Sequence, residues 1–302
     1  MISLPHLAFA SPRKLPRAAR LAGRVVVLDI AFASEGLGRG FAKTTGKFID
    51  QLGPRLARWV DHHDHPLHTQ FSEDPRFVLC KKSQHGACPE IITPELVADT
   101  GPIDTILAHF DLDGLYATAK WILGGKEPYP GADGDARAVD TRVGEIGPTG
   151  RLIDRALRAH YGDAVLKTRV VKYLIGGLQP GIERETIMSA AADQGRMNEE
   201  SRRLADQFDL RGDIAFIVVA RGNRPYDKTE LLLLGQQIAA VSMVSESGNV
   251  TIAAPFDSGL DFVALLDLGG GMPTRVNVPD RRIDEALHLI QVAINARGVA
   301  PE

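Results

Sequence analysis

The chain has 302 residues, of which 44% are hydrophobic and 24% are charged, and its formal net charge is −3. This length and composition predict a globular protein with ample core, divided more readily into two ordinary domains than one large one. The weak net charge and the 6% of aromatic residues argue against a dedicated nucleic-acid-binding module, and the absence of any apolar stretch near the roughly 20 residues of a membrane helix favours a cytoplasmic protein that does not bind membranes.

Apolar runs that end in acidic residues recur through the first half of the chain. Residues 24–30 (RVVVLDI) predict a buried strand that ends near Asp29, and residues 57–60 (ARWV) predict a second strand that leads into Asp61-His62-His63. Further strands are expected at 76–80 and 105–109, and helices at 41–56, from Pro94 onwards, and at 114–123. Strands and helices in alternation predict a parallel α/β sheet.

The second half of the chain has a different character. A helical pattern covers 149–178, with a break at 176–181, and a long helix with a strongly polar second half is expected from 183 to 208. Short β-rich runs follow at 214–220, 237–244 and 250–254, and a closing helix is expected at 283–296. This pattern predicts a catalytic α/β domain over 1–182, a linker helix over 183–208 and a smaller α+β domain over 209–302.

Three of the predicted strands end in carboxylates, and two of these ends also carry histidine. Asp29 ends the first strand, Asp61 the second, and His109-Phe110-Asp111-Leu112-Asp113-Gly114 follows the strand at 105–109. The carboxyl ends of parallel strands meet at one edge of a sheet. Two divalent ions that share a carboxylate there could activate a water molecule and neutralise a phosphoryl group. Each motif alone also fits an ordinary surface turn or a helix cap, but together they predict a metal-dependent phosphohydrolase.

In this setting Asp61-His62-His63, the HFDLDG segment and the strand ending at Asp29 resemble the DHH phosphoesterase superfamily. The resemblance implies a parallel α/β domain, a linker helix and a smaller DHH-associated domain. It also implies two Mn²⁺ or Mg²⁺ ions and a substrate that is a phosphate-bearing small molecule or a short oligonucleotide. The family normally has the HxDxD element before the other two motifs, so the order here suggests a circularly permuted catalytic domain.

The resemblance also implies roles for individual residues. His109 and Asp111 would hold one ion, Asp113 and His62 the other, and Asp29 would bridge both. The last acidic ligand would be Asp140, with Asp133 and Asp135 as alternatives. His63 would contact the phosphate or protonate the leaving oxygen, and Asp61 would orient the adjacent imidazoles.

The C-terminal part contains Gly269-Gly270-Gly271-Met272-Pro273, where the family usually has a glycine run followed by histidine. Gly270 and Gly271 would let the backbone approach a substrate anion. Met272 cannot replace an imidazole, and Arg275 is expected to contact the substrate instead, with a plain surface arginine as the alternative. The lost histidine supports a second hypothesis, a non-catalytic ligand-binding or regulatory member of the same fold. The sequence leaves a homodimer open.

Overall fold

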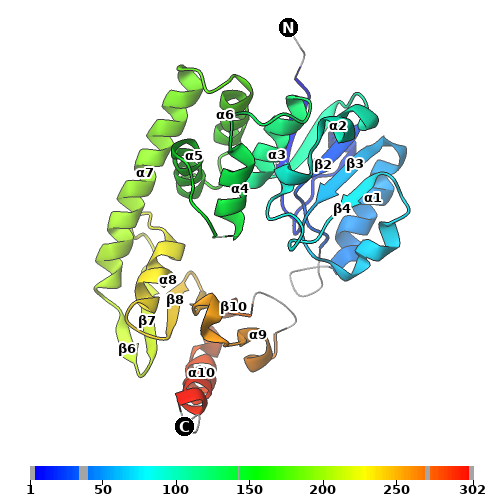
Figure 1. Cartoon of the computed structure of the whole chain (residues 1–302). Helices are drawn as coiled ribbons and strands as arrows, with labels where there is room; N and C mark the ends of the chain where they lie inside the picture. Colours follow the sequence, from blue (N-terminus) through cyan, green and yellow to red (C-terminus); the bar gives the residue numbers. More distant parts are fainter. Residues whose placement is uncertain (1–3, 34–39, 142, 269–272, 299–302) are drawn as a thin grey trace. The chain divides into compact units, whose positions relative to one another are not determined.

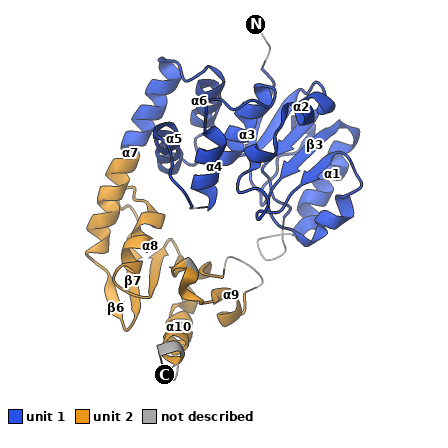
Figure 2. Ribbon diagram, in the orientation of Figure 1, with its two compact units in different colours: residues 1–193 blue, residues 194–302 orange. Residues whose placement is uncertain are grey.

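The computed structural model describes residues 4–33, 40–141, 143–268 and 273–298. The chain divides into two compact units, 1–193 and 194–302 (Figure 2). The division falls inside helix α7 (Ile182–Ala205), which is the long polar helix expected between the domains. The predicted domain boundaries at 182 and 208 treat this helix as a separate linker. The two compact units instead each include part of α7, so those boundaries stay a prediction.

The first unit contains a parallel sheet of five strands, as predicted. They are β1 (His6–Ala10), β2 (Val25–Leu28), β3 (Leu56–Asp61), β4 (Phe77–Leu79) and β5 (Thr105–His109), in the spatial order β1-β5-β2-β3-β4. Figure 1 shows β2, β3 and β4 side by side in this sheet. All four residues of β2 are fully buried. Because helices cover both faces of such a sheet, side chains on both sides of each strand are buried. The strands therefore occur in the sequence as unbroken apolar runs.

Strand β1 is the one strand of this sheet that the sequence did not predict. It pairs in parallel with β5, from His6 opposite Thr105 to Ala10 opposite His109. Its five residues carry only a weak apolar pattern, and the partner that makes them a strand lies about 100 residues away. Local sequence patterns do not contain this information.

Helices pack on both faces of the first sheet because alternate residues of each strand point to opposite sides. Val25 and Val27 belong to a core cluster with Phe48 and Leu52 of α1 (Lys47–Leu52). Val26 and Leu28 belong to another cluster with side chains of α3 (Leu112–Ile122). The remaining helices of the unit are α2 (Pro94–Thr100), α4 (Ala132–Thr141), α5 (Pro148–Ala159) and α6 (Ala164–Ile175). The second unit's helices are α8 (Lys228–Gln236), α9 (Phe262–Leu265) and α10 (Ile283–Gly298).

The second unit is a smaller α+β fold, as predicted. Its strands are β6 (Asp209–Arg211), β7 (Ile214–Val219), β8 (Val241–Glu246), β9 (Asn249–Ala253) and β10 (Arg275–Pro279), in the order β10-β9-β8-β7-β6. Only β7 and β8 pair in parallel. The strand expected at 237–244 begins later, at Val241, because α8 extends to Gln236 and a turn follows it. None of the helices in the described ranges is both long enough and apolar enough to cross a bilayer.

Candidate metal centre

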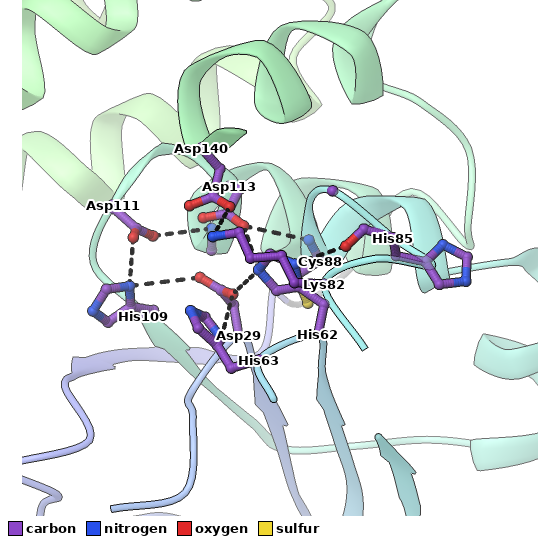
Figure 3. Close-up of polar contacts among 12 residues, drawn as sticks. Asp29, His62, His63, Lys82, His85, Cys88, His109, Asp111, Asp113 and Asp140 are labelled. Atoms are coloured by element: carbon purple, nitrogen blue, oxygen red, sulfur yellow. Dashed lines mark hydrogen bonds and ion pairs between the residues drawn. The ribbon is translucent and has the colours of Figure 1, made fainter. Parts of the chain in front are cut away.

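The strands that carry the predicted motifs lie next to one another at the centre of the first sheet. Strand β2 pairs in parallel with β5 on one side and with β3 on the other. Asp29 follows the last residue of β2, Asp61 is the last residue of β3, and His109 is the last residue of β5. The three motifs therefore meet at one edge of the sheet (Figure 3).

Asp29 lies at the middle of this group. Its side chain is buried, and its backbone N–H donates to the Val60 carbonyl at 2.9 Å. Its φ is +58°, a left-handed conformation that aspartate and asparagine tolerate better than other non-glycine residues. One carboxylate oxygen lies 3.3 Å from His62 Nε2, and the other lies 3.5 Å from His109 Nδ1. Asp29 can thus offer one oxygen to each of two neighbouring ions.

The first group of possible ligands consists of Asp29, His109 and Asp111, whose ligand atoms all lie within 4.8 Å of one another. His109 Nδ1 is 2.6 Å from Asp111 Oδ2. The other oxygen of Asp111 accepts a hydrogen bond from the Gly114 N–H at 3.3 Å and so caps α3. The start of α3 thereby fixes the carboxylate beside His109.

The second group consists of His62, Asp113 and Asp140, again within 4.8 Å. His62 Nε2 is 3.3 Å from Asp113 Oδ2, and that same oxygen accepts from the Cys88 N–H. Asp140 comes from α4, outside the three strand ends. A third possible group consists of Asp29, His62 and His63. The structure thus brings together the residues that the sequence analysis assigned to two ions, and the assignment of each ligand to an ion stays a prediction.

Asp133 and Asp135, the alternatives to Asp140, have other partners. Asp133 accepts from Lys120 Nζ at 2.5 Å. Asp135 is buried and accepts from the Gly147 and Gly150 N–H groups at the start of α5. Neither belongs to a potential metal-binding group among the described residues.

Hydrogen bonds from outside the cluster orient its two adjacent histidines. His62 Nδ1 lies 3.0 Å from the His85 carbonyl, which can only accept, so Nδ1 carries the proton and a neutral ring leaves Nε2 free as a ligand. His63 Nδ1 lies 2.8 Å from Asp61 Oδ1. Asp61 is thus placed to orient His63, as the sequence analysis expected, whereas the His85 carbonyl was not foreseen because a backbone atom leaves no trace in sequence.

Lys82 is a further residue of the cluster that the sequence analysis missed. Its Nζ lies 2.6 Å from Asp140 Oδ2 (Figure 3). The residue belongs to the loop after β4, and nothing in its local sequence distinguishes it from Lys81. A positive charge of the chain itself thus occupies the neighbourhood of one candidate ligand.

The cluster shifts the pKa values of its own groups. Burial raises the pKa of Asp29, and the nearby Asp113 carboxylate raises it further. Burial lowers the pKa of His62, but the carboxylates of Asp113 and Asp29 outweigh burial and raise it to about 11. Burial also lowers the pKa of His109, but the carboxylates of Asp111 and Asp29 outweigh burial and raise it to about 11. Because metals bind neutral imidazole, a divalent ion must displace protons here, and its affinity rises with pH.

The residues present fit a divalent metal. Among the described residues, both carboxylate oxygens of Asp29 and the Nε2 atom of His62 are buried and make no hydrogen bond, although charged neighbours lie 3.3–3.5 Å away. Buried polar atoms are normally hydrogen-bonded, and buried charges are paired or coordinate metals. Mixed imidazole and carboxylate ligands suit Mn²⁺ and related divalent ions.

The predicted substrate contacts lie in the second unit. Gly270, Gly271 and Met272 fall outside the described residues. Arg275 is the first residue of β10, and one of its guanidinium N–H groups donates to Thr229 Oγ1 at 3.3 Å. The contact of Arg275 with a substrate stays a prediction.

The cluster and the fold were compared with known proteins. No protein-family model matches the chain, and no curated protein matches its sequence. A solved structure of the exonuclease RecJ bound to manganese is similar over 94% of this chain and 78% of RecJ, with a TM-score of 0.51 and 11% identity. The fold of this chain is thus similar to that of RecJ, and it agrees with the fold that the resemblance to the DHH phosphoesterases implied. A second similar structure is the pGpG-specific phosphodiesterase PggH from Vibrio cholerae, with 12% identity, a TM-score of 0.43 and coverage of 91% and 99%. The circular permutation stays a prediction.

Proposed function

We propose that the chain is a metal-dependent phosphohydrolase that cleaves a phosphoester or phosphoanhydride at a dinuclear centre. The observation that supports this most is the shared position of Asp29, whose two buried oxygens face histidines of two separate ligand groups. RecJ, whose fold is similar, is an exonuclease that binds manganese. The centre contains more acidic and imidazole side chains than a structural ion pair does: Asp29, His62, His63, His109, Asp111, Asp113 and Asp140.

The proposed metal ligands divide as the geometry groups them. Asp29, His109 and Asp111 would hold one ion, and His62, Asp113 and Asp140 would hold the other, with Asp29 shared. Mn²⁺ or Mg²⁺ held there would supply a water molecule of lowered pKa and would offset charge on the phosphoryl oxygens.

His63 is the proposed proton donor. Burial lowers the pKa of His63, but the hydrogen bond to Asp61 and the nearby Asp29 outweigh burial and raise it to about 9 in the metal-free protein, which favours the protonated ring. Asp61 occupies Nδ1, which leaves Nε2–H to donate to a phosphoryl oxygen or to the leaving oxygen. About a third of the His63 side chain (34%) is exposed, so a substrate can reach it.

Substitution of Asp29 tests the proposal. Asparagine is the more informative replacement, because it keeps the shape and tolerates φ of +58°, whereas alanine adds backbone strain of about 1–2 kcal/mol. We expect Asp29→Asn to lower Mn²⁺-dependent hydrolysis by at least about 100-fold and to weaken Mn²⁺ binding, with the fold retained. The substrates to assay are pyrophosphate, polyphosphate, a linear dinucleotide and a cyclic dinucleotide, each with and without a chelator.

Asp99→Asn is the matched control, since Asp99 is exposed on α2, outside the cluster. Full activity in Asp29→Asn would contradict the assignment of Asp29 as a shared metal ligand. Metal binding by the unsubstituted protein without turnover of any substrate would favour the alternative hypothesis, a non-catalytic ligand-binding member of the fold.

A further inference from the structure

A cavity of about 190 Å³ lies directly against the metal-ligand cluster. One end is formed by Asp111, Asp113 and Asp140, which are themselves candidate ligands. The remainder of its lining is mostly apolar or aromatic and comes from the start of α3, from α4 and from α5 and the residues after it: Phe110, Leu112, Val139, Leu157 and Tyr161, with Asp154 and Arg158 as the polar members. A ligand in this cavity would touch the metal centre at one end only.

Two aromatic rings form one wall of this cavity. Phe110 stands between the candidate ligands His109 and Asp111, and its ring meets the Tyr161 ring edge to face, with centroids 4.7 Å apart. Tyr161 is 63% exposed although it lines a cavity of the site. The Tyr161 side chain is therefore not part of the core, and much of its surface is accessible from the cavity and from solvent.

A buried lysine holds the aromatic pair in place. Lys167 is 4% exposed, and its Nζ donates to the Tyr161 carbonyl at 2.5 Å. The same ammonium lies 5.0 Å from the Phe110 ring centroid and 5.7 Å from that of Tyr161, within the range of cation–π attraction. The hydrogen bond holds the Tyr161 backbone, and the two cation–π contacts place the ammonium against both rings beside the metal ligands.

The polar members of the lining are a pair of opposite charges. Arg158 Nη1 and Asp154 Oδ2 lie 3.8 Å apart on one turn of α5. The pair makes this part of the lining polar, next to the aromatic wall. A planar ligand with polar edges suits this lining better than a purely hydrocarbon ring does.

We propose that this cavity is a nucleobase subsite, so that the substrate is a nucleotide whose base packs on the wall formed by Phe110 and Tyr161 while its phosphodiester lies at the cluster. This inference rests on the proposed phosphohydrolase function and narrows its substrate. Pyrophosphate and polyphosphate have no planar group and would leave the aromatic wall unused. Aromatic stacking accepts any base, so the subsite selects for the presence of a base and not for its identity.

The test compares a linear dinucleotide with its abasic analogue, in which the same phosphodiester joins two sugars without bases. For Tyr161→Ala we expect kcat/KM on the dinucleotide to fall roughly 5- to 150-fold, with the low kcat/KM on the abasic analogue unchanged. Tyr161→Phe keeps the ring and should retain the activity. Val165→Ala is the control for loss of an exposed apolar side chain, since Val165 is 64% exposed on α6 and is not among the lining residues.

A binding measurement separates failure of this subsite from failure of the proposed function. It uses the Mn²⁺-loaded protein and a phosphorothioate dinucleotide, followed by calorimetry. Weaker binding in Tyr161→Ala would support the subsite even if no variant hydrolyses any substrate. Hydrolysis of the dinucleotide and its abasic analogue at equal rates by the unsubstituted protein, or equal rates in Tyr161→Ala and Tyr161→Phe, would overturn the subsite and leave the hydrolase proposal standing.

Discussion

At the scale of single residues, Lys82 gives the cluster a positive charge of its own. Its ammonium lies 2.6 Å from Asp140 Oδ2, and its side chain is 39% exposed. A divalent ion that uses Asp140 as a ligand meets this charge, because two cations then compete for one carboxylate. Lys82 therefore opposes metal binding while it stabilises the metal-free protein.

Removal of that charge should strengthen metal binding. For Lys82→Gln we expect Mn²⁺ affinity to rise roughly fivefold, because a partly exposed ion pair is worth no more than about 1 kcal/mol. Isothermal titration calorimetry of the metal-free protein measures this directly and needs no substrate. Lys81→Gln is the matched control, since Lys81 is an exposed neighbour of the same charge. An equal gain in both variants, or no gain in Lys82→Gln, would show that Lys82 does not compete with the metal.

Most of the residues that the sequence placed in the metal centre lie at or just after the end of an apolar strand. Asp29, His62 and His109 could be found in this way because buried parallel strands are continuous apolar runs and their ends are visible in the sequence. Asp140 lies on a helix and was assigned through the family resemblance alone. Lys82 and Tyr161 reach the site through tertiary packing, and no local pattern marks them.

At the scale of elements, one buried carboxylate connects three segments behind the cluster. Asp135 of α4 accepts from Gly147 N–H at 2.5 Å and Gly150 N–H at 3.2 Å, and also from the Tyr129 hydroxyl at 2.5 Å. Two of these donors belong to the start of α5. Asp135 thus joins the helix that carries Asp140 to the helix that lines the neighbouring cavity.

Loss of this carboxylate should destabilise the first unit. For Asp135→Ala we expect a loss of about 2–4 kcal/mol in the free energy of unfolding, since the helix start loses its acceptor and buried donors lose their partner. Urea denaturation followed by circular dichroism measures it. Asp163→Ala provides the comparison, because Asp163 caps α6 from an exposed position and should cost only about 1 kcal/mol. Equal costs would mean that the buried connections of Asp135 add nothing to an ordinary cap.

The sequence predicted those strands and helices whose apolar or capping pattern lies within the element itself. The four buried strands β2 to β5 and the start of α2, which Thr93 caps through the Leu96 N–H, were predicted close to their bounds. Strand β1 and the short strands β6 and β10 were not. The partners of β1 and β10 lie about 100 and about 20 residues away, and β6 is a three-residue exposed strand without an apolar pattern. The order of β5 next to β2 likewise depends on pairing that no sequence window contains.

At the scale of the whole molecule, every described candidate ligand belongs to the first unit, 1–193. A ligand that binds only the folded state stabilises the unit that holds it. The second unit has its own core, built around β7 to β10, α9 and α10. The two units should therefore respond differently to metal.

Differential scanning calorimetry with Mn²⁺ and with a chelator tests this. At a free Mn²⁺ concentration about 100 times the Kd, the first unit should gain about 2.7 kcal/mol, which corresponds to a rise in Tm of roughly 5–10 °C for a unit of this size. The transition of the second unit should stay in place. A shift of both transitions by the same amount would contradict the assignment of all ligands to one unit.

The central position of β2 in the first sheet has a consequence for the order of events in folding. Asp29 and His109 lie about 80 residues apart along the chain, and they meet only after β5 has paired with β2. Closing so long a loop is an entropic cost that comes before any contact at the cluster can form. We therefore expect a metal ion to find its complete set of ligands assembled late in folding, after β5 has joined the sheet. The ion would prolong the lifetime of the folded chain by slowing its unfolding and leave the rate of folding unchanged.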